Sequence, residues 1–266
     1  MLIKLTNRCT MMCPHCMEDS TPDSGEFITM DIFRKAVYFG LDVGCKVFIL
    51  SGGEPTEHDQ LLRLCQWLDN TLRGRMSLFS ICTNGMWLKD QQKCEQMKKI
   101  TRLSTFKGMQ IYTHKRWYRE YDYVIKHKMD YERFPHTLVE VDSPIYMQDL
   151  GRARSCEEAQ KEVAKNPYFM SCCNCALAAR QLEMRDFGVT LTIRRQFCKP
   201  SVDAQGYVHM SESRLCPTVG SVNKDKSEDI YERMRSFVPC GRCANCVRFK
   251  ESEDLKIQQA KHLLFG

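Results

Sequence analysis

The sequence predicts an α/β fold with a parallel sheet, followed by a small cysteine-rich extension. Two observations carry this prediction. Short β-rich runs alternate with helical segments through about the first 150 residues, and strands that alternate with helices form βα units with parallel pairing. After about residue 145 the alternation stops and cysteines become dense. We therefore expect one domain over residues 1–150 and a second, smaller one over 151–266.

The elements of the first part follow from local residue patterns. Five β-rich runs are expected as strands, namely 2–6, 46–50, 77–82, 109–112 and 137–141. Four intervening segments are expected as helices, namely 29–42, 58–72, 87–100 and 115–131. Thr29 can cap the first helix, because a threonine oxygen at that position accepts a hydrogen bond from a free backbone N–H.

Three loops with unusual residues follow the first three predicted strands. Cys9 comes after the first strand, Gly52 and Gly53 after the second, and Thr83-Asn84-Gly85 after the third. Parallel α/β folds place their active groups at the carboxyl ends of the strands. The three loops are therefore predicted to meet at one edge of the sheet.

The extension is expected to contain a hairpin over residues 196–215. The run from Val202 to Val208 supplies its turn, and Gly206 is the residue expected to adopt a positive φ. No internal repeat and no low-complexity tract interrupts the chain.

Composition excludes several classes of protein. The chain has 266 residues, of which 43% are hydrophobic and 27% charged, as expected for a globular protein with a buried core. No apolar run approaches the length that spans a bilayer, and the apolar start, Met1 to Leu5, is too short for a signal peptide. We expect a cytoplasmic protein without a membrane partner. A formal net charge of +6 is too modest to indicate nucleic-acid binding.

The 16 cysteines are the informative feature of the composition. Three lie within residues 9–16, three within 172–175 and three within 240–246. In a cytoplasmic chain, clustered cysteines indicate metal binding or catalysis rather than disulfides. Cys45, Cys65, Cys82 and Cys94 lie apart from these clusters and are expected to be ordinary small core residues.

The first cluster has the spacing Cys9-x3-Cys13-x2-Cys16. A loop this tight can wrap an iron–sulfur cubane and leave one iron without a protein ligand, an open position of the kind that catalytic metals keep. Three cysteines alone would also fit a zinc loop or chance. Two further motifs, Ser51-Gly52-Gly53-Glu54-Pro55 and Thr83-Asn84-Gly85, follow in order. Together the three motifs resemble the radical S-adenosylmethionine (SAM) superfamily over residues 1–115.

This resemblance implies a partial (β/α) barrel, a [4Fe-4S] cluster held by Cys9, Cys13 and Cys16, and bound SAM. The residues implied to contact SAM are His15, Ser51, Gly52, Gly53, Glu54, Thr83 and Asn84. His15 stands where the family usually has an aromatic residue, near the adenine. Glu54 is expected within reach of the amino group of SAM, and the two glycines allow backbone to approach a ligand closely.

The later cysteines resemble the SPASM/twitch extension, which holds an auxiliary [4Fe-4S] cluster. Gly151-Arg152-Ala153 resembles a motif that often precedes it. Five cysteines compete for at most four ligand positions: Cys198, Cys216, Cys240 and Cys243 are preferred, with Cys246 as the fifth candidate. Met210 departs from the pattern, since cysteine is common near that position. A structural zinc site is the alternative, and Cys172, Cys173 and Cys175 could supply a ligand, a catalytic thiol, a radical quencher or packing.

The resemblance implies reductive cleavage of SAM to a 5′-deoxyadenosyl radical, which takes a hydrogen atom from a substrate. The first expectation is oxidation or cross-linking of a peptide or protein. The alternatives are a small-molecule dehydrogenase acting on a carbohydrate or cyclitol-like substrate, and a non-enzymatic iron–sulfur or zinc binding module. An electron donor such as flavodoxin or ferredoxin is the expected partner.

Residues 115–123 mix aromatic and basic side chains and could line a substrate channel or touch RNA, but a helix with one packed face is the preferred interpretation.

Overall fold

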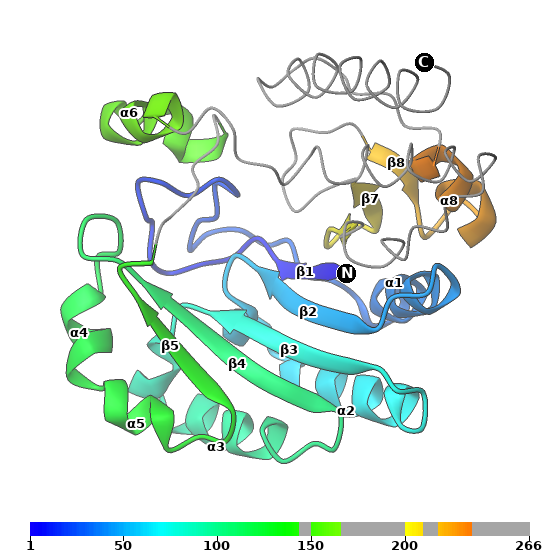
Figure 1. Cartoon of the computed structure of the whole chain (residues 1–266), viewed down its shortest axis with the longest axis horizontal. Helices are drawn as coiled ribbons and strands as arrows, with labels where there is room; N and C mark the ends of the chain where they lie inside the picture. The colour runs from blue at the N-terminus through cyan, green and yellow to red at the C-terminus, as the bar shows by residue number, and fades with distance from the viewer. Residues whose placement is uncertain (144–149, 166–199, 210–217, 236–266) are drawn as a thin grey trace, which may run out of the picture.

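A mostly parallel sheet forms the centre of the protein (Figure 1). The computed structural model describes residues 1–143, 150–165, 200–209 and 218–235. Within these ranges the strands form one eight-stranded sheet in the order β5-β4-β3-β2-β1-β6-β7-β8. The strands are β1 (Leu2–Thr6), β2 (Val47–Gly52), β3 (Leu78–Thr83), β4 (Phe106–Thr113), β5 (Thr137–Val141), β6 (Ser201–Val202), β7 (Tyr207–His209) and β8 (Thr218–Ser221). Strands β1 to β5 pair in parallel, which gives the predicted open, partial α/β barrel.

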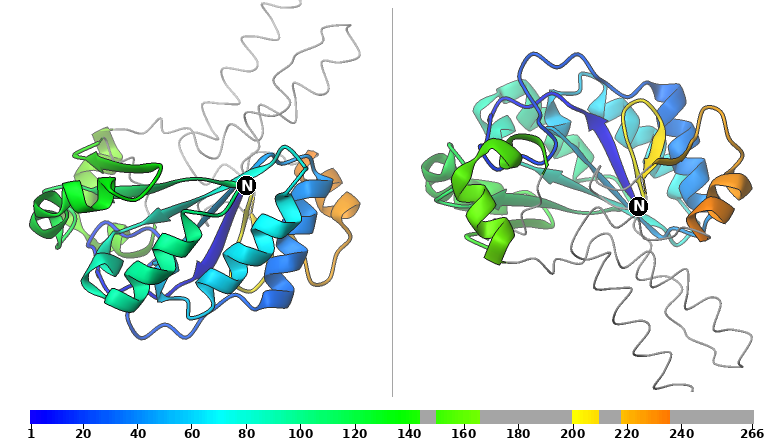
Figure 2. Two further views of the ribbon diagram at one scale, coloured as in Figure 1. Left: turned by 90° about the horizontal axis from the view of Figure 1, so that it is seen from below. Right: turned by 90° about the horizontal axis from the view of Figure 1, so that it is seen from above.

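The helices of the first part cover one face of this sheet (Figures 1 and 2). They are α1 (Met30–Asp42), α2 (Leu61–Leu72), α3 (Gln91–Ile100), α4 (Tyr121–Lys126) and α5 (Lys128–Glu132). The loop between β1 and α1 and helix α6 (Glu157–Lys165) lie on the other side, and α8 (Ser227–Arg235) lies near β8. No helix in the described ranges is long and apolar enough to cross a membrane.

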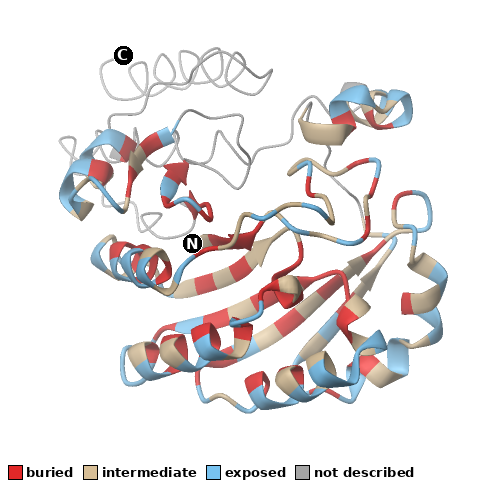
Figure 3. Cartoon of the chain, turned by 180° about the vertical axis from the view of Figure 1, so that it is seen from behind, coloured by how far each residue is buried: buried red, intermediate tan, exposed pale blue. Residues whose placement is uncertain are grey.

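The main core lies between the sheet and these helices (Figure 3). Alternate residues of the central strands are buried there, including Leu50, Phe79, Ile81, Met109 and Ile111. This period of two is what a half-buried strand requires, since successive side chains point to opposite faces. The intervening residues therefore face away from the helices, toward the loop that carries the first cysteines.

Two predicted helices are shorter than the sequence indicated. The segment 87–100 is divided by Asp90, whose carboxylate accepts hydrogen bonds from Gln92 N (2.8 Å) and Lys93 N (3.1 Å) and so begins α3. The segment 115–131 becomes helical only at Tyr121 and divides into α4 and α5. There Asp142, after β5, accepts a hydrogen bond from Lys115 N (2.8 Å) and holds the chain in a loop.

Two other boundaries also moved. Helix α2 begins at Leu61 rather than at residue 58, because a short 3-10 helix, Pro55–Glu57, precedes it. Strand β4 spans Phe106–Thr113 rather than 109–112. The first helix agrees closely with its prediction: Thr29 accepts a hydrogen bond from Ile32 N (3.2 Å) and caps α1.

The middle of the predicted hairpin is confirmed as β6 and β7, while residues 196–199 and 210–215 lie outside the described residues. Gly206 has φ of +87°, a left-handed conformation that favours glycine in this turn. Strand β6 pairs in parallel with β1, so the hairpin continues the main sheet. The domain boundary near residue 150 stays a prediction.

Asp203 organises the turn of this hairpin. Its Oδ1 accepts hydrogen bonds from Gln205 N (3.0 Å) and Tyr207 N (2.9 Å), and its Oδ2 lies 3.0 Å from His209 Nε2. Burial alone would raise the pKa of Asp203, but these hydrogen bonds outweigh it and hold the pKa below the ordinary value of 3.8.

Replacing Asp203 by asparagine should therefore lower the free energy of unfolding by about 1–2 kcal/mol at neutral pH. A carboxyl group with a lowered folded-state pKa stabilises the fold fully above its unfolded pKa, and this contribution is lost as the pH falls through the folded value. Urea denaturation at pH 7 and below pH 4 tests this. The difference between wild type and Asp203→Asn should shrink at the lower pH, and an equal difference at both pH values would contradict it.

Candidate functional site

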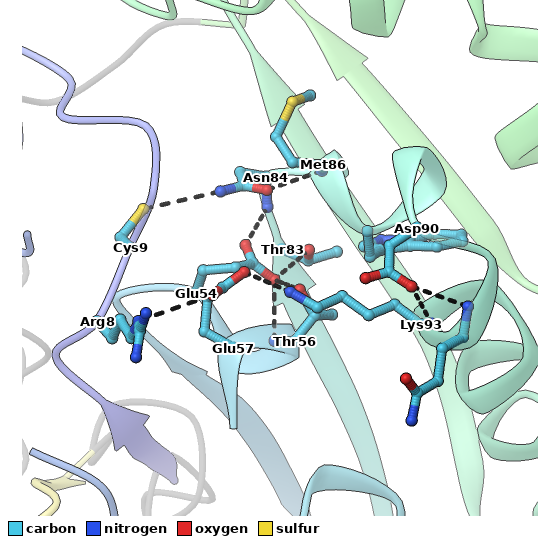
Figure 4. A network of polar contacts seen from close by, with 12 residues as sticks. Arg8, Cys9, Glu54, Thr56, Glu57, Thr83, Asn84, Met86, Asp90 and Lys93 are labelled. Carbon is cyan, nitrogen blue, oxygen red and sulfur yellow. Dashed lines mark hydrogen bonds and ion pairs between the residues drawn. The ribbon is translucent and has the colours of Figure 1, made fainter. Parts of the chain in front are cut away.

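The three unusual loops meet at the carboxyl edge of the sheet, as predicted. Cys9 follows β1, Glu54 follows β2 and Asn84 follows β3, and Figure 4 shows their side chains within one polar network. The network is held together by hydrogen bonds between side chains and backbone from different loops. Parallel pairing of β1, β2 and β3 is what aligns the three loops.

Glu54 is the centre of this network. Its side chain is buried, and its Oε1 accepts hydrogen bonds from Thr56 N (3.1 Å), Thr56 Oγ1 (2.7 Å) and Thr83 Oγ1 (2.7 Å). Its Oε2 accepts one from Asn84 N (2.7 Å). Burial raises the pKa of Glu54, and the hydrogen bonds oppose this shift without cancelling it. One carboxyl group thus joins the ends of β2 and β3.

Asn84 extends the network to the first cysteine. Its Nδ2 lies 3.7 Å from Cys9 Sγ, within hydrogen-bonding range for sulfur, and its Oδ1 accepts a hydrogen bond from Met86 N (2.8 Å). The turn after Asn84 needs Gly85, which has φ of +84°. The amide of Asn84 is therefore fixed on both sides and aimed at the cysteine loop.

Gly52 and Gly53 are required by the chain's own backbone. A Cβ on Gly52 would collide with Thr6 O, and one on Gly53 with Arg8 O. Gly53 N donates to Thr6 O (2.7 Å) and Glu54 N donates to Arg8 O (2.8 Å), so the end of β2 presses against the chain leading to Cys9. The two glycines were expected to let the backbone approach a ligand closely. In the structure they let it approach β1 and the loop after β1. Ser51 pairs with Lys4 in the register of β1 and β2 and is half-buried.

Cys9, Cys13 and Cys16 lie in one partly buried loop. Burial raises the pKa of Cys9 to about 11 and that of Cys13 to about 12. Charge on the neighbouring thiols adds to both shifts, because Cys16 acts on Cys9, and both Cys9 and Cys16 act on Cys13. The three sulfurs are thus close enough for their charges to interact. In the described ranges, however, no group of three or more histidine, cysteine, aspartate or glutamate side chains has the geometry of a formed metal site. Soft thiolates whose charges repel one another suit a cationic iron–sulfur core, which relieves the repulsion.

His15 is buried against an aromatic wall that the sequence did not assign to the site. Its ring centroid lies 5.0 Å from that of Tyr118 and 5.8 Å from that of Trp117. Burial lowers the pKa of His15 to about 4, so the ring is neutral near pH 7, and its buried Nδ1 has no hydrogen-bond partner among the residues that the structure describes. Burial also raises the pKa of Tyr118, and charge on the three cysteines adds to that shift. The only sign of this wall in the sequence is the run of aromatic residues within 115–123.

The remaining predicted ligands lie outside the described residues. These are Cys198, Cys216, Cys240, Cys243 and Cys246, together with Cys172, Cys173 and Cys175. Among the cysteines expected in the core, Cys65 is fully buried, while Cys45, Cys82 and Cys94 are half-buried.

Comparison with known proteins matches the first part of the chain. A family model described as the radical SAM superfamily matches residues 3–109. A GTP 3′,8-cyclase of Tolumonas auensis is 31% identical over 91 residues, which cover 34% of this chain and 26% of the relative. A PqqA peptide cyclase of Bradyrhizobium diazoefficiens is 34% identical over 64 residues, or 24% of this chain and 17% of the relative. The chain thus spans about a quarter or less of the length of these two relatives.

Solved structures share the fold over more of the chain. The crystal structure of BtrN in complex with AdoMet and 2-DOIA has a TM-score of 0.59 at 13% identity, covering 94% of this chain and 89% of that one. Native anSMEcpe with bound AdoMet and Cp18Cys peptide has a TM-score of 0.51 at 13% identity, covering 87% and 79%. At this identity the likeness is one of fold. The family match and the three loop motifs identify residues 3–109 of this chain as a radical SAM domain.

Proposed function

We propose that this chain is a radical SAM enzyme whose cluster is held by Cys9, Cys13 and Cys16. The observation that carries the proposal is the hydrogen-bond network of Glu54, which joins the loops after β2 and β3 and sets Asn84 against Cys9. A radical SAM domain implies a [4Fe-4S] cluster and SAM. When bound, the cluster supplies one electron that splits SAM into methionine and a 5′-deoxyadenosyl radical, which removes a hydrogen atom from the substrate.

The residues of the site would bind and orient SAM. Glu54 Oε2 accepts one hydrogen bond in the structure, so it retains capacity for the amino group of SAM. Ser51, Gly52, Gly53 and Thr83 shape the same edge. The neutral ring of His15 would lie near the adenine. Trp117 and Tyr118 support that ring and exclude water from it.

We further propose an auxiliary [4Fe-4S] cluster of the twitch type, with Cys198, Cys216, Cys240 and Cys243 as ligands and Cys246 as the fifth candidate. The β6–β7 hairpin supports this proposal, because the chain segments that carry Cys198 and Cys216 flank it in sequence. Such a cluster would accept the electron left on the substrate after hydrogen abstraction. Flavodoxin or ferredoxin would supply the electron for SAM cleavage.

The substrate proposed first is a peptide or protein that is oxidised or cross-linked. The similarity to the PqqA peptide cyclase, which extends over 64 residues of this chain, supports a peptide substrate. The substrate would approach the carboxyl edge of the sheet, where the three loops meet, on the face away from the helices.

A polar row on that face favours a second candidate, a small-molecule dehydrogenase. Gln110 Oε1 accepts hydrogen bonds from Tyr112 Oη (3.1 Å) and from Cys82 Sγ (3.5 Å). Glu140 lies beside Tyr112 in the register of β4 and β5 and is half-buried. A carboxylate, an amide, a phenol and a thiol in one row suit a substrate rich in hydroxyl or amino groups, such as a carbohydrate or a cyclitol.

Metal content tests the proposal that the chain holds two [4Fe-4S] clusters. Anaerobic reconstitution with iron and sulfide should load about eight irons per chain, two cubanes' worth. The Cys9→Ala, Cys13→Ala, Cys16→Ala triple variant should keep about half of that iron through the C-terminal cysteines. Iron, sulfide and zinc analyses provide the measurement. Zinc in place of the second four irons would support a structural zinc site and contradict the auxiliary cluster. An iron-loaded chain that forms no 5′-deoxyadenosine would instead favour a binding module.

A further inference from the structure

The segment Gly151–Ser155, after β5, contacts the backbone of the cysteine loop, the part of the chain between β1 and α1 that carries Cys9, Cys13 and Cys16. Arg152 N donates to Cys16 O (3.0 Å), and the Arg152 guanidinium donates from Nε to Cys13 O (3.0 Å). The same guanidinium donates from Nη1 to Ser20 O (2.8 Å) and to the Asp19 carboxylate (3.1 Å). One side chain more than 130 residues away in sequence thus holds three points of the loop.

Gly151 makes this approach possible. It has φ of +50°, and a Cβ on it would stand 2.6 Å from Cys16 O and 2.9 Å from Asp19 N. Any other residue would push the segment away from the loop. Ala153, the next residue after Arg152, is fully buried against Trp117, whose ring also contacts His15. Each residue of Gly151-Arg152-Ala153 therefore has its own contact with the site.

We propose that Gly151 and Arg152 form a clasp that sets the shape of the cysteine loop and places a positive charge beside the cluster it carries. Arg152 is thereby a positioning residue, and this inference rests on the proposed function. The loop needs such support because Met12 and Asp19 both adopt positive φ, at 49° and 53°, which non-glycine residues rarely do. Glu18, the residue before Asp19, adds a second anchor through an ion pair with the buried Lys4.

Arginine suits this task better than lysine. Its planar guanidinium presents five N–H donors in a fixed fork, and it stays charged at any ordinary pH. A lysine would keep the charge but would lose the fixed geometry that serves several acceptors at once. The positive charge also lies beside Cys13, since Arg152 Nε donates to Cys13 O. A cation beside the cluster would stabilise its more negative, reduced state.

The test compares Arg152→Met and Arg152→Lys with wild type, all as full-length, anaerobically reconstituted chains. The readouts are the rate of iron release to a ferrous chelator and the midpoint potential of the SAM-responsive cluster in an EPR-monitored titration. Arg152→Met should release iron from this cluster about tenfold faster, as expected when a group that orients metal ligands is removed. Its midpoint potential should shift to a more negative value.

Arg152→Lys should keep a potential near that of wild type but release iron faster, since the charge remains and the fork is lost. Arg233→Met is the matched control, because Arg233, an exposed residue of α8, pairs with Asp225. It should leave both readouts unchanged. If Arg152→Met does not fold, Arg152→Lys decides alone, and iron release at the wild-type rate would overturn the clasp. Wild-type release and potential in a folded Arg152→Met would do the same. A wild-type chain that binds no cluster would overturn the proposed function and the clasp with it.

Discussion

Replacing Cys9, Cys13 and Cys16 together by alanine is expected to abolish formation of 5′-deoxyadenosine. The proposed centre has three protein ligands, so their removal leaves nothing to hold the iron that would bind SAM. The three thiols already lie in one loop where their charges interact. The measurement is the amount of 5′-deoxyadenosine formed with dithionite and SAM, and a drop to the background of a protein-free reaction is expected.

A double variant, Cys45→Ala with Cys94→Ala, is the control for cysteine loss in general. Both thiols are half-buried and lie outside the three loops. This variant should retain activity close to that of wild type. If the triple variant still formed 5′-deoxyadenosine after reconstitution, Cys9, Cys13 and Cys16 would not be the ligands of the reacting cluster.

Replacing Glu54 by alanine is expected to damage both stability and activity. It leaves the buried backbone N–H groups of Thr56 and Asn84 without acceptors. At about 1–3 kcal/mol for each buried unsatisfied donor, the free energy of unfolding should fall by about 2–6 kcal/mol. The loop that carries Asn84 would also lose its link to β2, and with it the contact between Asn84 and Cys9. Urea denaturation and 5′-deoxyadenosine yield give the two measurements.

Two further variants separate the role of Glu54 from that of any nearby carboxylate. Glu54→Gln keeps the shape and one acceptor, so it should fall between wild type and Glu54→Ala. Glu57→Gln, in the same turn, removes a carboxylate that pairs with Lys93 and Arg8 nearer the surface. Such pairs contribute at most about 1 kcal/mol, so Glu57→Gln should be close to wild type. Similar losses in Glu57→Gln and Glu54→Ala would contradict the central position of Glu54.

The strands and the edge at which the loops meet could be predicted from sequence because both follow from local rules. Short β-rich runs mark β1, β2 and β3, and parallel pairing then puts Cys9, Gly53 and Asn84 at one edge. The division of residues 87–100 at Asp90 also had a local signal, since aspartate is a favourable N-cap. Interpreting those residues as one helix missed it.

The remaining parts of the site depend on contacts between distant segments. Nothing near Arg152 in the sequence indicates that its guanidinium reaches Cys13 O, and nothing near Trp117 indicates that its ring lies against His15. The glycines of β2 were correctly expected to permit a close approach, but only the structure shows that the backbone of β1 and its loop is what they approach. Motifs identify which residues matter, whereas tertiary packing decides what each of them touches.

The most direct test of the central proposal is the yield of 5′-deoxyadenosine from the wild-type chain. The chain would be reconstituted anaerobically, supplied with SAM and dithionite, and its products quantified by liquid chromatography with mass detection. The account predicts 5′-deoxyadenosine and methionine in equal amounts, formed only when both iron and reductant are present. A chain that holds a four-iron cluster with three thiolate ligands, binds SAM and yet forms no 5′-deoxyadenosine under reducing conditions would contradict it.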